Sequence, residues 1–310
     1  MVRELSSRPV RDFRGRFRPH FRRTWLTFPA PKAEVAICLY WCGSLSVPPV
    51  ENLLDVADRA RVELADLIDL QMAPLGLAAM NALGQIKGKT VLDVGCGTGQ
   101  STLQLAQLTG KSGRVIGVDI APCSLKVAHS RLQNLAWVSL EQADAAQLGC
   151  PDHSIDVIYS RFGVMFFSDP VQAFGNLRRM LRPGGRLGFV CWRPIEENEL
   201  DFLPLEAGGL TLDDAPHVSF EQPSRIKVVL GAAGFSKIAV EPFDAEVSCG
   251  GLDRTMDVVT RVGALGKALR DKPYTRLAVE PRVRAAIATR EQAGRVGLNA
   301  ATWIVTASNA

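Results

Sequence analysis

Apolar and polar residues alternate in short blocks through the middle of the chain. Five apolar runs have the length of strands, and helical periodicity follows the first, second and fourth of them. This alternation predicts a mostly parallel sheet with helices on both faces. The expected strands are Thr90–Val94, Arg114–Asp119, Trp137–Glu141, Ser154–Ser160 and Leu187–Trp192, and the expected helices are Gln100–Leu108, one that opens at Pro122, and Val171–Leu181.

The segments on either side of these blocks have different patterns. Helical spacing begins at Glu51, and Pro74 predicts a break before a second helix at Leu75–Leu83. Residues 193–222 have little periodicity, and we interpret them as a lid or substrate-side insertion. The last part of the chain predicts helices at Gln222–Gly234, Thr255–Leu269 and Val279–Gln292, and strands at Lys237–Val240 and Thr302–Thr306.

The net charge of +4 is unevenly distributed. Residues 1–32 hold nine Lys or Arg and two acids, which gives +7, whereas residues 33–310 hold 27 basic and 30 acidic residues, which gives −3. Residues 1–50 also contain six prolines and no sustained periodicity, so we predict an irregular or disordered arm ahead of a domain over 51–310. The charge of the domain itself does not favour nucleic acid as a partner.

The seven cysteines are scattered and contain no C-x-x-C pair. An odd number without such spacing favours neither a disulfide framework nor a zinc site, and no metal is expected. The pattern is typical of a reducing compartment, so we predict a cytoplasmic protein. The longest apolar run near the N-terminus, Val35–Cys42, is too short to span a bilayer.

A glycine-rich turn follows the first predicted strand and leads into a helix. Gly95, Gly97 and Gly99 have the spacing G-x-G-x-G, and Gln100 stands where a dinucleotide fingerprint has its third glycine. Glycines allow sharp bends and a close approach by a ligand, and the helix N-terminus offers unpaired N–H groups to an anionic group. Asp93 at the strand end would repel a pyrophosphate, but it suits the ammonium of an amino-acid moiety.

The segment Leu92–Gly99 resembles motif I of the class I S-adenosylmethionine (SAM)-dependent methyltransferases, close to the ubiquinone/menaquinone-biosynthesis type. The resemblance covers about Leu75–Trp192 well and Gln222–Ser308 loosely. It implies a Rossmann-like seven-stranded sheet of order 3-2-1-4-5-7-6, in which the last two strands form a hairpin. It also implies methyl transfer from SAM to a small-molecule acceptor. Residues 1–50 depart from the family, whose corresponding segment helps to close the cofactor site.

The resemblance also implies the residues that contact SAM. Asp119 matches the acid that accepts the ribose hydroxyls, and Asp144 matches the acceptor for the adenine amino group. The backbone around Ser160 and Arg161 lies where the family holds the methionine ammonium. The full set of cofactor candidates is Asp93, Gly95, Cys96, Gly97, Gly99, Asp119, Ile120, Asp144, Ala145, Ser160 and Arg161. Several have a simpler structural interpretation: Ser160 and Arg161 as loop residues, Asp144 as a helix N-cap and Asp119 as a strand-end cap.

No catalytic residue is assigned from the sequence. His129 and His153 fall away from the carboxyl edge of the predicted sheet, and His217 lies in the 193–222 insertion. The acids Glu196, Glu197, Glu199 and Asp201 are interpreted as a solvated face. Large apolar residues, most of them aromatic, follow the fourth and fifth strands. They would form a wall for the sulfonium or for a hydrophobic acceptor, with core packing as the alternative. These residues are Phe162, Met165, Phe166, Phe167 and Trp192.

Three other functions remain as alternatives. A nicotinamide-dependent dehydrogenase would need the third glycine elsewhere. A nucleic-acid methyltransferase is favoured by the Arg-rich arm, but Ser160–Gly163 is not the Asn/Asp-Pro-Pro-aromatic tetrapeptide of amino-methylating enzymes. A SAM-binding protein without turnover is the third. The acceptor and the oligomeric state do not follow from the sequence.

Overall fold

The computed structural model describes residues 50–211 and 220–310, with side chains from Val56 onward. The described residues belong to one compact unit. The predicted arm, apart from Val50, and His217 lie outside the described residues. No helix in the described ranges is long and apolar enough to cross a membrane.

Two helices precede the sheet, but they are divided at a different place from the one predicted. Helix α1 spans Val50–Glu63 and α2 spans Ala65–Ala82, with the break at Leu64 and Pro74 inside α2. The predicted break at Pro74 is therefore wrong. Pro74 lies on the exposed side of α2, where the Leu70 carbonyl that loses its helical partner can bond to water. Burial of Leu75 and Ala79 on the opposite side keeps the helix continuous.

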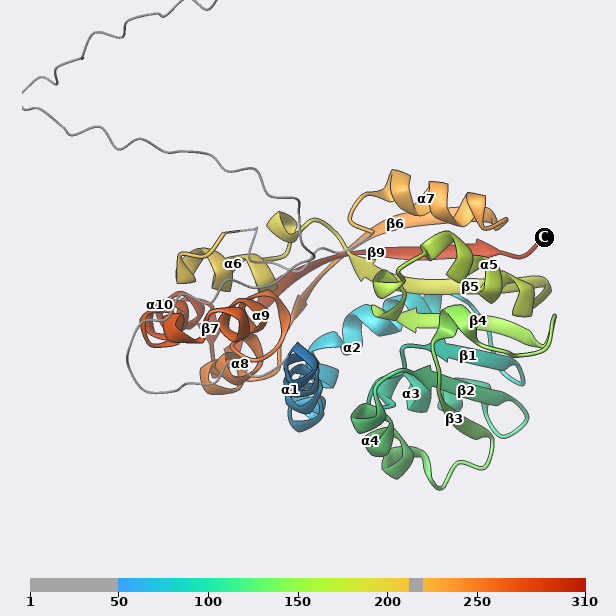
Figure 1. Ribbon diagram of the computed structural model, residues 1–310, viewed down its shortest axis with the longest axis horizontal. Helices are drawn as coiled ribbons and strands as arrows, with labels where there is room; N and C mark the ends of the chain where they lie inside the picture. Colours follow the sequence, from blue (N-terminus) through green and yellow to red (C-terminus); the bar gives the residue numbers. More distant parts are fainter. Residues whose placement is uncertain (1–49, 212–219) are drawn as a thin grey trace, which may run out of the picture. The chain divides into compact units, whose positions relative to one another are not determined.

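The seven-stranded sheet has the order β3-β2-β1-β4-β5-β9-β6, which confirms the predicted order, because β9 and β6 are its seventh and sixth strands (Figure 1). Strands β1 to β5 are parallel, and β9 runs antiparallel to both β5 and β6. The strands are β1 Thr90–Val94, β2 Arg114–Asp119, β3 Val138–Gln142, β4 Ile155–Arg161, β5 Leu181–Trp192, β6 Ser236–Val247 and β9 Leu298–Ser308.

Helices cover both faces of this sheet. Alternate residues of β1 point to opposite sides, so that Val91 packs with α2 and α3 and Leu92 packs with α5 and α7. Aromatic residues fill the second side, where Phe174 contacts Phe189 and Phe220. The helices are α3 Gln100–Thr109, α4 Pro122–Leu132, α5 Pro170–Met180 and α7 Pro223–Ala232.

The last two strands of the sheet pair with each other, but they do not form a simple hairpin. Between them the chain forms α8 Leu252–Val259, α9 Gly263–Asp271, α10 Arg276–Ala288 and the short pair β7 Glu291–Gln292 and β8 Arg295–Val296. The expectation of a hairpin is therefore corrected. The predicted helix at Thr255–Leu269 is two helices, because the chain turns at Thr260–Val262.

Helices α8 to α10 pack together with α6 (Glu199–Gly208), and we call these four helices the helical insertion. Pairing of Trp192 with Thr302 places residues 298–301 of β9 beyond the carboxyl end of β5. The Asn198 side chain accepts a hydrogen bond from Ala301 N at 2.7 Å, which anchors α6 to this overhang. The helical insertion thus stands beyond the carboxyl edge of the sheet (Figure 1).

Two acids in this region contradict the interpretation of a solvated face. Asp201 accepts a hydrogen bond from Ala264 N at 3.0 Å and so caps the first turn of α9, and burial raises the pKa of its carboxyl. Glu199 pairs with Arg290 and accepts from Asn299 N at 3.1 Å. Both acids hold the helical insertion together, which the local sequence does not reveal because their partners are about 60 to 100 residues away.

Candidate active site

The three glycines after β1 share a left-handed backbone conformation but differ in what surrounds them. All have positive φ, at +70° for Gly95, +52° for Gly97 and +84° for Gly99, a region that side chains rarely adopt. A Cβ at Gly95 would lie 2.8 Å from the Cα of Gly163, and one at Gly99 would lie 2.9 Å from the Cβ of Ala128. A Cβ at Gly97 would meet nothing within 4 Å. Only Gly97 therefore leaves open space that a ligand could occupy.

Asp93 lies beneath this turn and is fully buried. Its Oδ2 accepts hydrogen bonds from the hydroxyls of Ser101 and Thr102, both at 2.7 Å, and this fixes the first turn of α3. Its Oδ1 has no hydrogen-bond partner among the described residues. Burial raises the pKa of Asp93 to about 6, despite the two hydroxyl donors that favour the anion. The neighbouring Cys96 is also buried, and desolvation raises the pKa of its thiol.

Asp119 ends β2 and orders the glycine turn from the neighbouring strand. Its Oδ2 accepts from Gly97 N at 2.8 Å, and its Oδ1 accepts from Ala121 N at 2.9 Å. A carboxylate can accept about four hydrogen bonds, so two further donors can be accommodated. The adjacent Ile120 is 70% exposed, which is unusual for a large apolar side chain at a sheet edge.

Asp144 and Ala145 follow β3 on the same edge of the sheet. Asp144 is exposed and accepts from Ala146 N at 2.9 Å, so it caps the short 3-10 helix Ala145–Gln147. Ala145 is buried, and its carbonyl accepts from Asn176 of α5 at 3.3 Å. Asp144 therefore serves as an N-cap, and its second carboxylate oxygen remains available for another hydrogen-bond donor.

Ser160 joins the end of β4 to the glycine turn. Its hydroxyl donates to the Val94 carbonyl at 2.8 Å and accepts from Gly163 N at 3.2 Å and Val164 N at 3.3 Å. The side chain is fully buried. Its function in this structure is to hold the chain after β4 against the chain after β1, so that Gly163 can approach Gly95.

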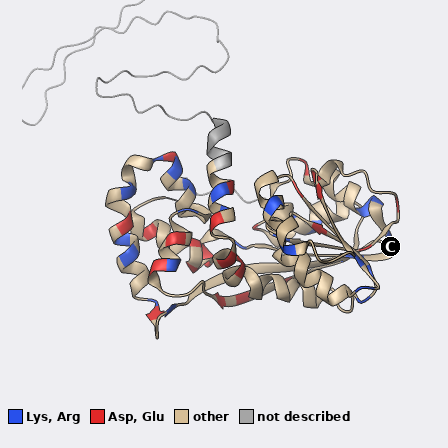
Figure 2. Cartoon of the chain, turned by 90° about the horizontal axis from the view of Figure 1, so that it is seen from below, with Lys and Arg blue, Asp and Glu red and all other residues tan. Residues whose placement is uncertain are grey.

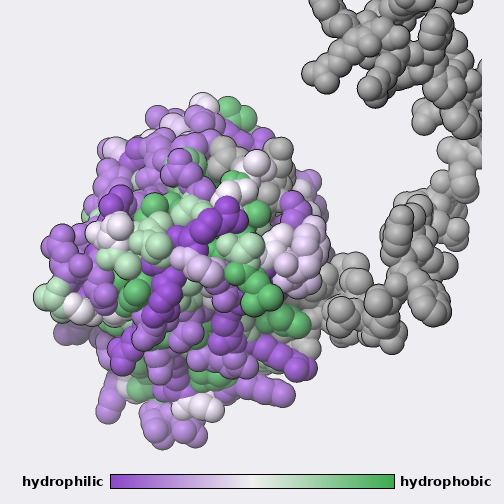
Figure 3. All heavy atoms as spheres, turned by 90° about the vertical axis from the view of Figure 1, so that its left-hand side faces the viewer, coloured by the Kyte–Doolittle hydropathy of each residue, from purple (hydrophilic) through white to green (hydrophobic). Residues whose placement is uncertain are grey.

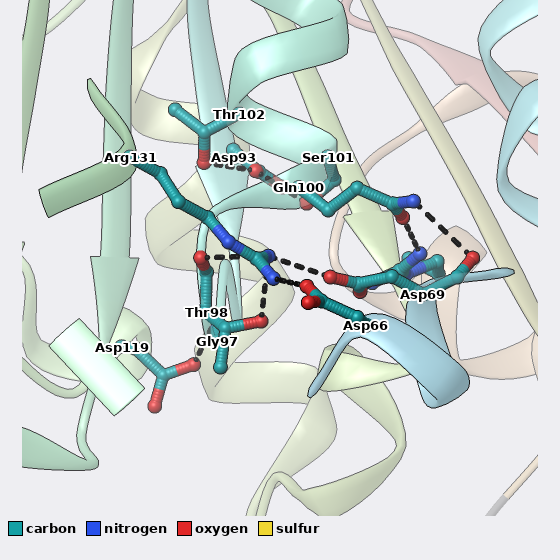
Figure 4. A network of polar contacts seen from close by, with 11 residues as sticks. Asp66, Asp69, Asp93, Gly97, Thr98, Gln100, Ser101, Thr102, Asp119 and Arg131 are labelled. Carbon is teal, nitrogen blue, oxygen red and sulfur yellow. Dashed lines mark hydrogen bonds and ion pairs between the residues drawn. The ribbon is translucent and has the colours of Figure 1, made fainter. Parts of the chain in front are cut away.

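Arg161 belongs to an ion-pair network that connects β4 to α2 and α4. Figure 4 shows Asp66, Asp69 and Arg131 of this network beside Thr98. Its guanidinium donates to Asp69 Oδ1 at 2.9 Å and also to Gln100 Oε1. Arg131 of α4 donates to Asp69 Oδ2 at 2.6 Å, to Asp66 at 2.6 Å, and to the carbonyl and hydroxyl of Thr98, each at 3.2 Å. We call Asp69 and these two arginines the Asp69 clamp. It holds α2 against the glycine turn.

Sequence reasoning missed Asp69, Arg131 and Gly163. The available signal was weak: Asp66 and Asp69 interrupt an apolar helical stretch at positions three residues apart, and the Asp69 side chain is only 8% exposed. A buried acid requires a cationic partner, but the sequence does not show which of 36 Lys and Arg residues supplies it.

An aromatic pair lies where β4 and β5 end. The rings of Phe162 and Trp192 are stacked, with centroids 4.2 Å apart and planes inclined by 16°. Both side chains are half-buried, and Phe162 has a positive φ of +64°. Phe166 nearby is exposed, whereas Met165 is buried and Phe167 packs edge-on against Phe174. The predicted wall is thus divided between core packing and a half-open aromatic surface.

The described histidines do not approach this edge. His129 is exposed in the last turn of α4, and His153 precedes β4, with Nδ1 3.0 Å from the Leu181 carbonyl. Two surface hollows also lie away from the glycine turn; one is lined by Lys89, Asp156 and Arg182, and the other lies between Leu83 and Thr306. No group of three potential metal ligands occurs in the described ranges.

Comparison with known proteins identifies the family of this chain. A family model described as a methyltransferase domain matches residues 92–189. The chain is 33% identical over 175 residues to the ubiquinone/menaquinone biosynthesis C-methyltransferase of Azotobacter vinelandii, a match that covers 50% of this chain and 69% of that protein. The chain belongs to the class I SAM-dependent methyltransferases. Its motif I, from Leu92 to Gly99, is the turn described above.

Two further comparisons cover different shares of this methyltransferase. The demethylmenaquinone methyltransferase of Staphylococcus carnosus is 37% identical over 106 residues, which are 34% of this chain and 44% of that protein. Among solved structures, the YcgJ protein from Bacillus subtilis has a TM-score of 0.52 at 22% identity and covers 76% of this chain and 97% of its own. This second similarity shows the shared fold alone.

Proposed function

We propose that this methyltransferase transfers a methyl group from SAM to a small apolar molecule that contains a ring. The observation that carries the proposal is the combination, on one edge of the sheet, of the open space over Gly97, the Asp119 carboxylate and the Phe162–Trp192 pair. Strands β2, β1, β4 and β5 are adjacent in the sheet, so their carboxyl ends form one continuous edge.

The residues present fit SAM in three respects. Gly97 leaves space for a ligand against the backbone, and the first turn of α3 offers N–H groups for a carboxylate. Asp119 retains acceptor capacity for two ribose hydroxyls, and the exposed Ile120 offers an apolar surface beside it for the adenine. Asp93, whose Oδ1 is buried without a partner, supplies negative potential for the ammonium.

SAM would supply an electrophilic methyl group on a sulfonium, whose displacement leaves a neutral thioether. The chain's own contribution is alignment, which can lower a barrier by about 7–11 kcal/mol when two reactants are held in line. The Asp69 clamp and Ser160 fix the glycine turn, and the aromatic pair offers a flat face for an acceptor ring. The acceptor gains the methyl group and loses a proton, and no residue is assigned to remove it.

The acceptor class follows from two lines of support. Offset-stacked aromatic surfaces bind flat apolar rings, and the half-buried state of Phe162 and Trp192 leaves ring surface for such contact. Two relatives carry names that refer to ubiquinone and menaquinone. We therefore propose a reduced quinone or a related phenolic ring as the acceptor.

The first test is calorimetric titration of the full chain with SAM, S-adenosylhomocysteine and NAD, followed by a methyl-transfer assay on a reduced naphthoquinone. We expect binding of the first two ligands, no binding of NAD, and turnover. Binding without turnover on any phenolic acceptor would favour a non-catalytic SAM-binding protein, and failure to bind SAM would exclude the proposal.

A second test addresses the aromatic pair. Trp192→Leu should raise the KM for the acceptor and leave the Kd for SAM unchanged, because Trp192 contributes the acceptor face only. The matched control is Trp137→Leu, a half-buried tryptophan at the amino end of β3, which should change neither constant. Equal effects of the two substitutions would remove Trp192 from the acceptor site.

A further inference from the structure

Helix α10 has two apolar faces. One of them, formed by Val279, Val283 and Ile287, is buried in the helical insertion. The other faces solvent and continues from the preceding turn at Pro273–Thr275. We call this second face the outer stripe; its exposed members are Tyr274, Leu277, Ala278, Pro281, Ala285 and Ala288.

The outer stripe follows helical periodicity. Its members recur at intervals of three and four residues, which places them along one side of the helix. A surface helix in a globular protein ordinarily presents one apolar stripe to the core and polar residues to water. Here Tyr274 is 81% exposed and Leu277 is 90% exposed, so two large apolar side chains lie almost wholly in water.

Basic residues flank the outer stripe. The segment that carries the stripe, residues 272–288, contains four Lys or Arg and one acid, which gives a net charge of +3, whereas residues 33–310 as a whole carry −3. Arg276 pairs with Glu280, and Arg284 pairs with Asp253. The Arg284 pair is exposed, and such pairs are weak and screened by salt, so this cation remains able to bind another anion. The four are Lys272, Arg276, Arg282 and Arg284.

The end of the molecule that carries α10 can be followed in two further figures. Figure 2 shows Lys and Arg, with Asp and Glu between them, along the helices at the left-hand end, where Figure 1 places α10. Figure 3 faces that end and shows hydrophobic residues at the surface between hydrophilic ones. The outer stripe lies on the side of the helical insertion away from the buried Val283.

We propose that the outer stripe binds the surface of an anionic phospholipid membrane. Tyr274 and Leu277 would enter the interface, where tyrosine has its amphipathic ring at the level of the headgroups, and the flanking cations would contact lipid phosphates. Apolar anchors combined with a basic flank are the pattern of helices that lie in the plane of a membrane surface.

The same features argue against a second copy of the chain as the occupant. Two outer stripes that face each other would bring together two segments that each carry a net charge of +3, which is unfavourable. Apart from Tyr274 and Leu277, the stripe is built from Ala and Pro, which offer little apolar area for a stable protein interface of standard size. Reversible attachment to a charged lipid surface needs less apolar area.

The test is co-sedimentation of the full chain with vesicles of phosphatidylcholine alone and of phosphatidylcholine with phosphatidylglycerol. We expect binding only to the anionic vesicles. The double substitution Tyr274→Ser and Leu277→Ser should weaken that binding by about tenfold or more, because the apolar groups no longer leave water. Val228→Ser is the matched control: Val228 is 70% exposed on α7, and its substitution should have no effect.

Two measurements separate this proposal from other causes. All variants carry the same Arg-rich residues 1–32, so equal binding by the double variant and the unmodified chain would assign the binding to those residues and overturn the proposal. Absence of binding to anionic vesicles would overturn it too, as would a dimer in light scattering that the double variant loses. SAM affinity is expected to be equal in all variants, which shows that they are folded.

Discussion

Arg161 donates a hydrogen bond to Asp69 across 2.9 Å and thereby joins the carboxyl end of β4 to helix α2. The same carboxylate receives Arg131 from α4, which also contacts Thr98 in the glycine turn. The segment that precedes the sheet is thus connected by charge to the segment that would hold the cofactor. Asp69 of α2 therefore contributes to the shape of the glycine turn, although motif I begins 23 residues later.

The first prediction concerns this clamp. Asp69→Asn leaves two partly buried guanidinium groups with reduced compensation, since Asp69 is 8% exposed and contacts both. We expect the free energy of unfolding to fall by roughly 2–4 kcal/mol, because removal of one partner of a buried ion pair leaves uncompensated charge. Urea denaturation measures this loss, and calorimetry should show weaker SAM binding.

The control for the clamp is Asp66→Asn. Asp66 lies 2.6 Å from the same Arg131, but its side chain is 95% exposed, so the pair should contribute about 0–1 kcal/mol. Equal losses of stability for the two variants would mean that burial does not distinguish the two acids, and the clamp would have no special role.

The second prediction distinguishes ligand contact from backbone strain at Gly97. Gly97→Ala introduces a Cβ at φ +52° with no protein atom within 4 Å, so stability should fall by only about 1–2 kcal/mol. SAM affinity should fall by a much larger factor if the ligand occupies that space. Gly184→Ala is the control, because Gly184 has φ +74° and similar open space at the other end of the sheet. An equal, small effect of both on SAM affinity would remove Gly97 from the site.

The sequence predicted the sheet because its information is local. Apolar runs, glycine turns and helical periodicity specify β1 to β4 within one or two residues, although β5 begins six residues before its predicted start, and the family resemblance supplied the order of all seven strands. The places where prediction failed depend on distant partners or on solvent. Asp69 meets Arg161 across 92 positions, and Asp201 caps a helix 63 residues away. Pro74 stays within α2 because its side of the helix is exposed, which periodicity alone did not reveal.

The candidate site is predicted only in part. The sequence located Gly95, Gly97 and Gly99, but it gave all three the same role, whereas the structure assigns open space to Gly97 and close contacts to the other two. Those contacts come from Gly163 and Ala128 on other elements, so no local pattern contains them. The roles of the predicted residues in SAM binding stay predictions, which substitutions at Gly97 and Asp119 test.

The third prediction concerns Asp119. Its carboxylate accepts from two backbone N–H groups, and asparagine has a single acceptor oxygen, so Asp119→Asn leaves one of those N–H groups unpaired. We expect the Kd for SAM and for S-adenosylhomocysteine to rise by the same factor, about tenfold or more, because both ligands share the ribose. Calorimetry checks this expectation. Asp169→Asn is the control, since asparagine replaces aspartate well at the N-cap of α5.

The fourth prediction is a pH dependence that originates from Asp93. Burial raises the pKa of this carboxyl from 3.8 to about 6 in the folded chain, so between these values the folded state binds a proton that the unfolded state has released. The free energy of unfolding should therefore fall as pH rises from about 4 to 6, by roughly 3 kcal/mol at most, and should then level off. Asp93→Asn keeps an acceptor for Ser101 and Thr102 but cannot ionise, so the difference in unfolding free energy between the two chains should follow that curve.

Urea denaturation of both chains at pH 4.5, 6 and 7.5 measures this difference. A difference that is constant across these values would show that Asp93 does not titrate in this range, whereas a fall that is smaller with SAM bound would indicate a ligand cation close to the carboxylate.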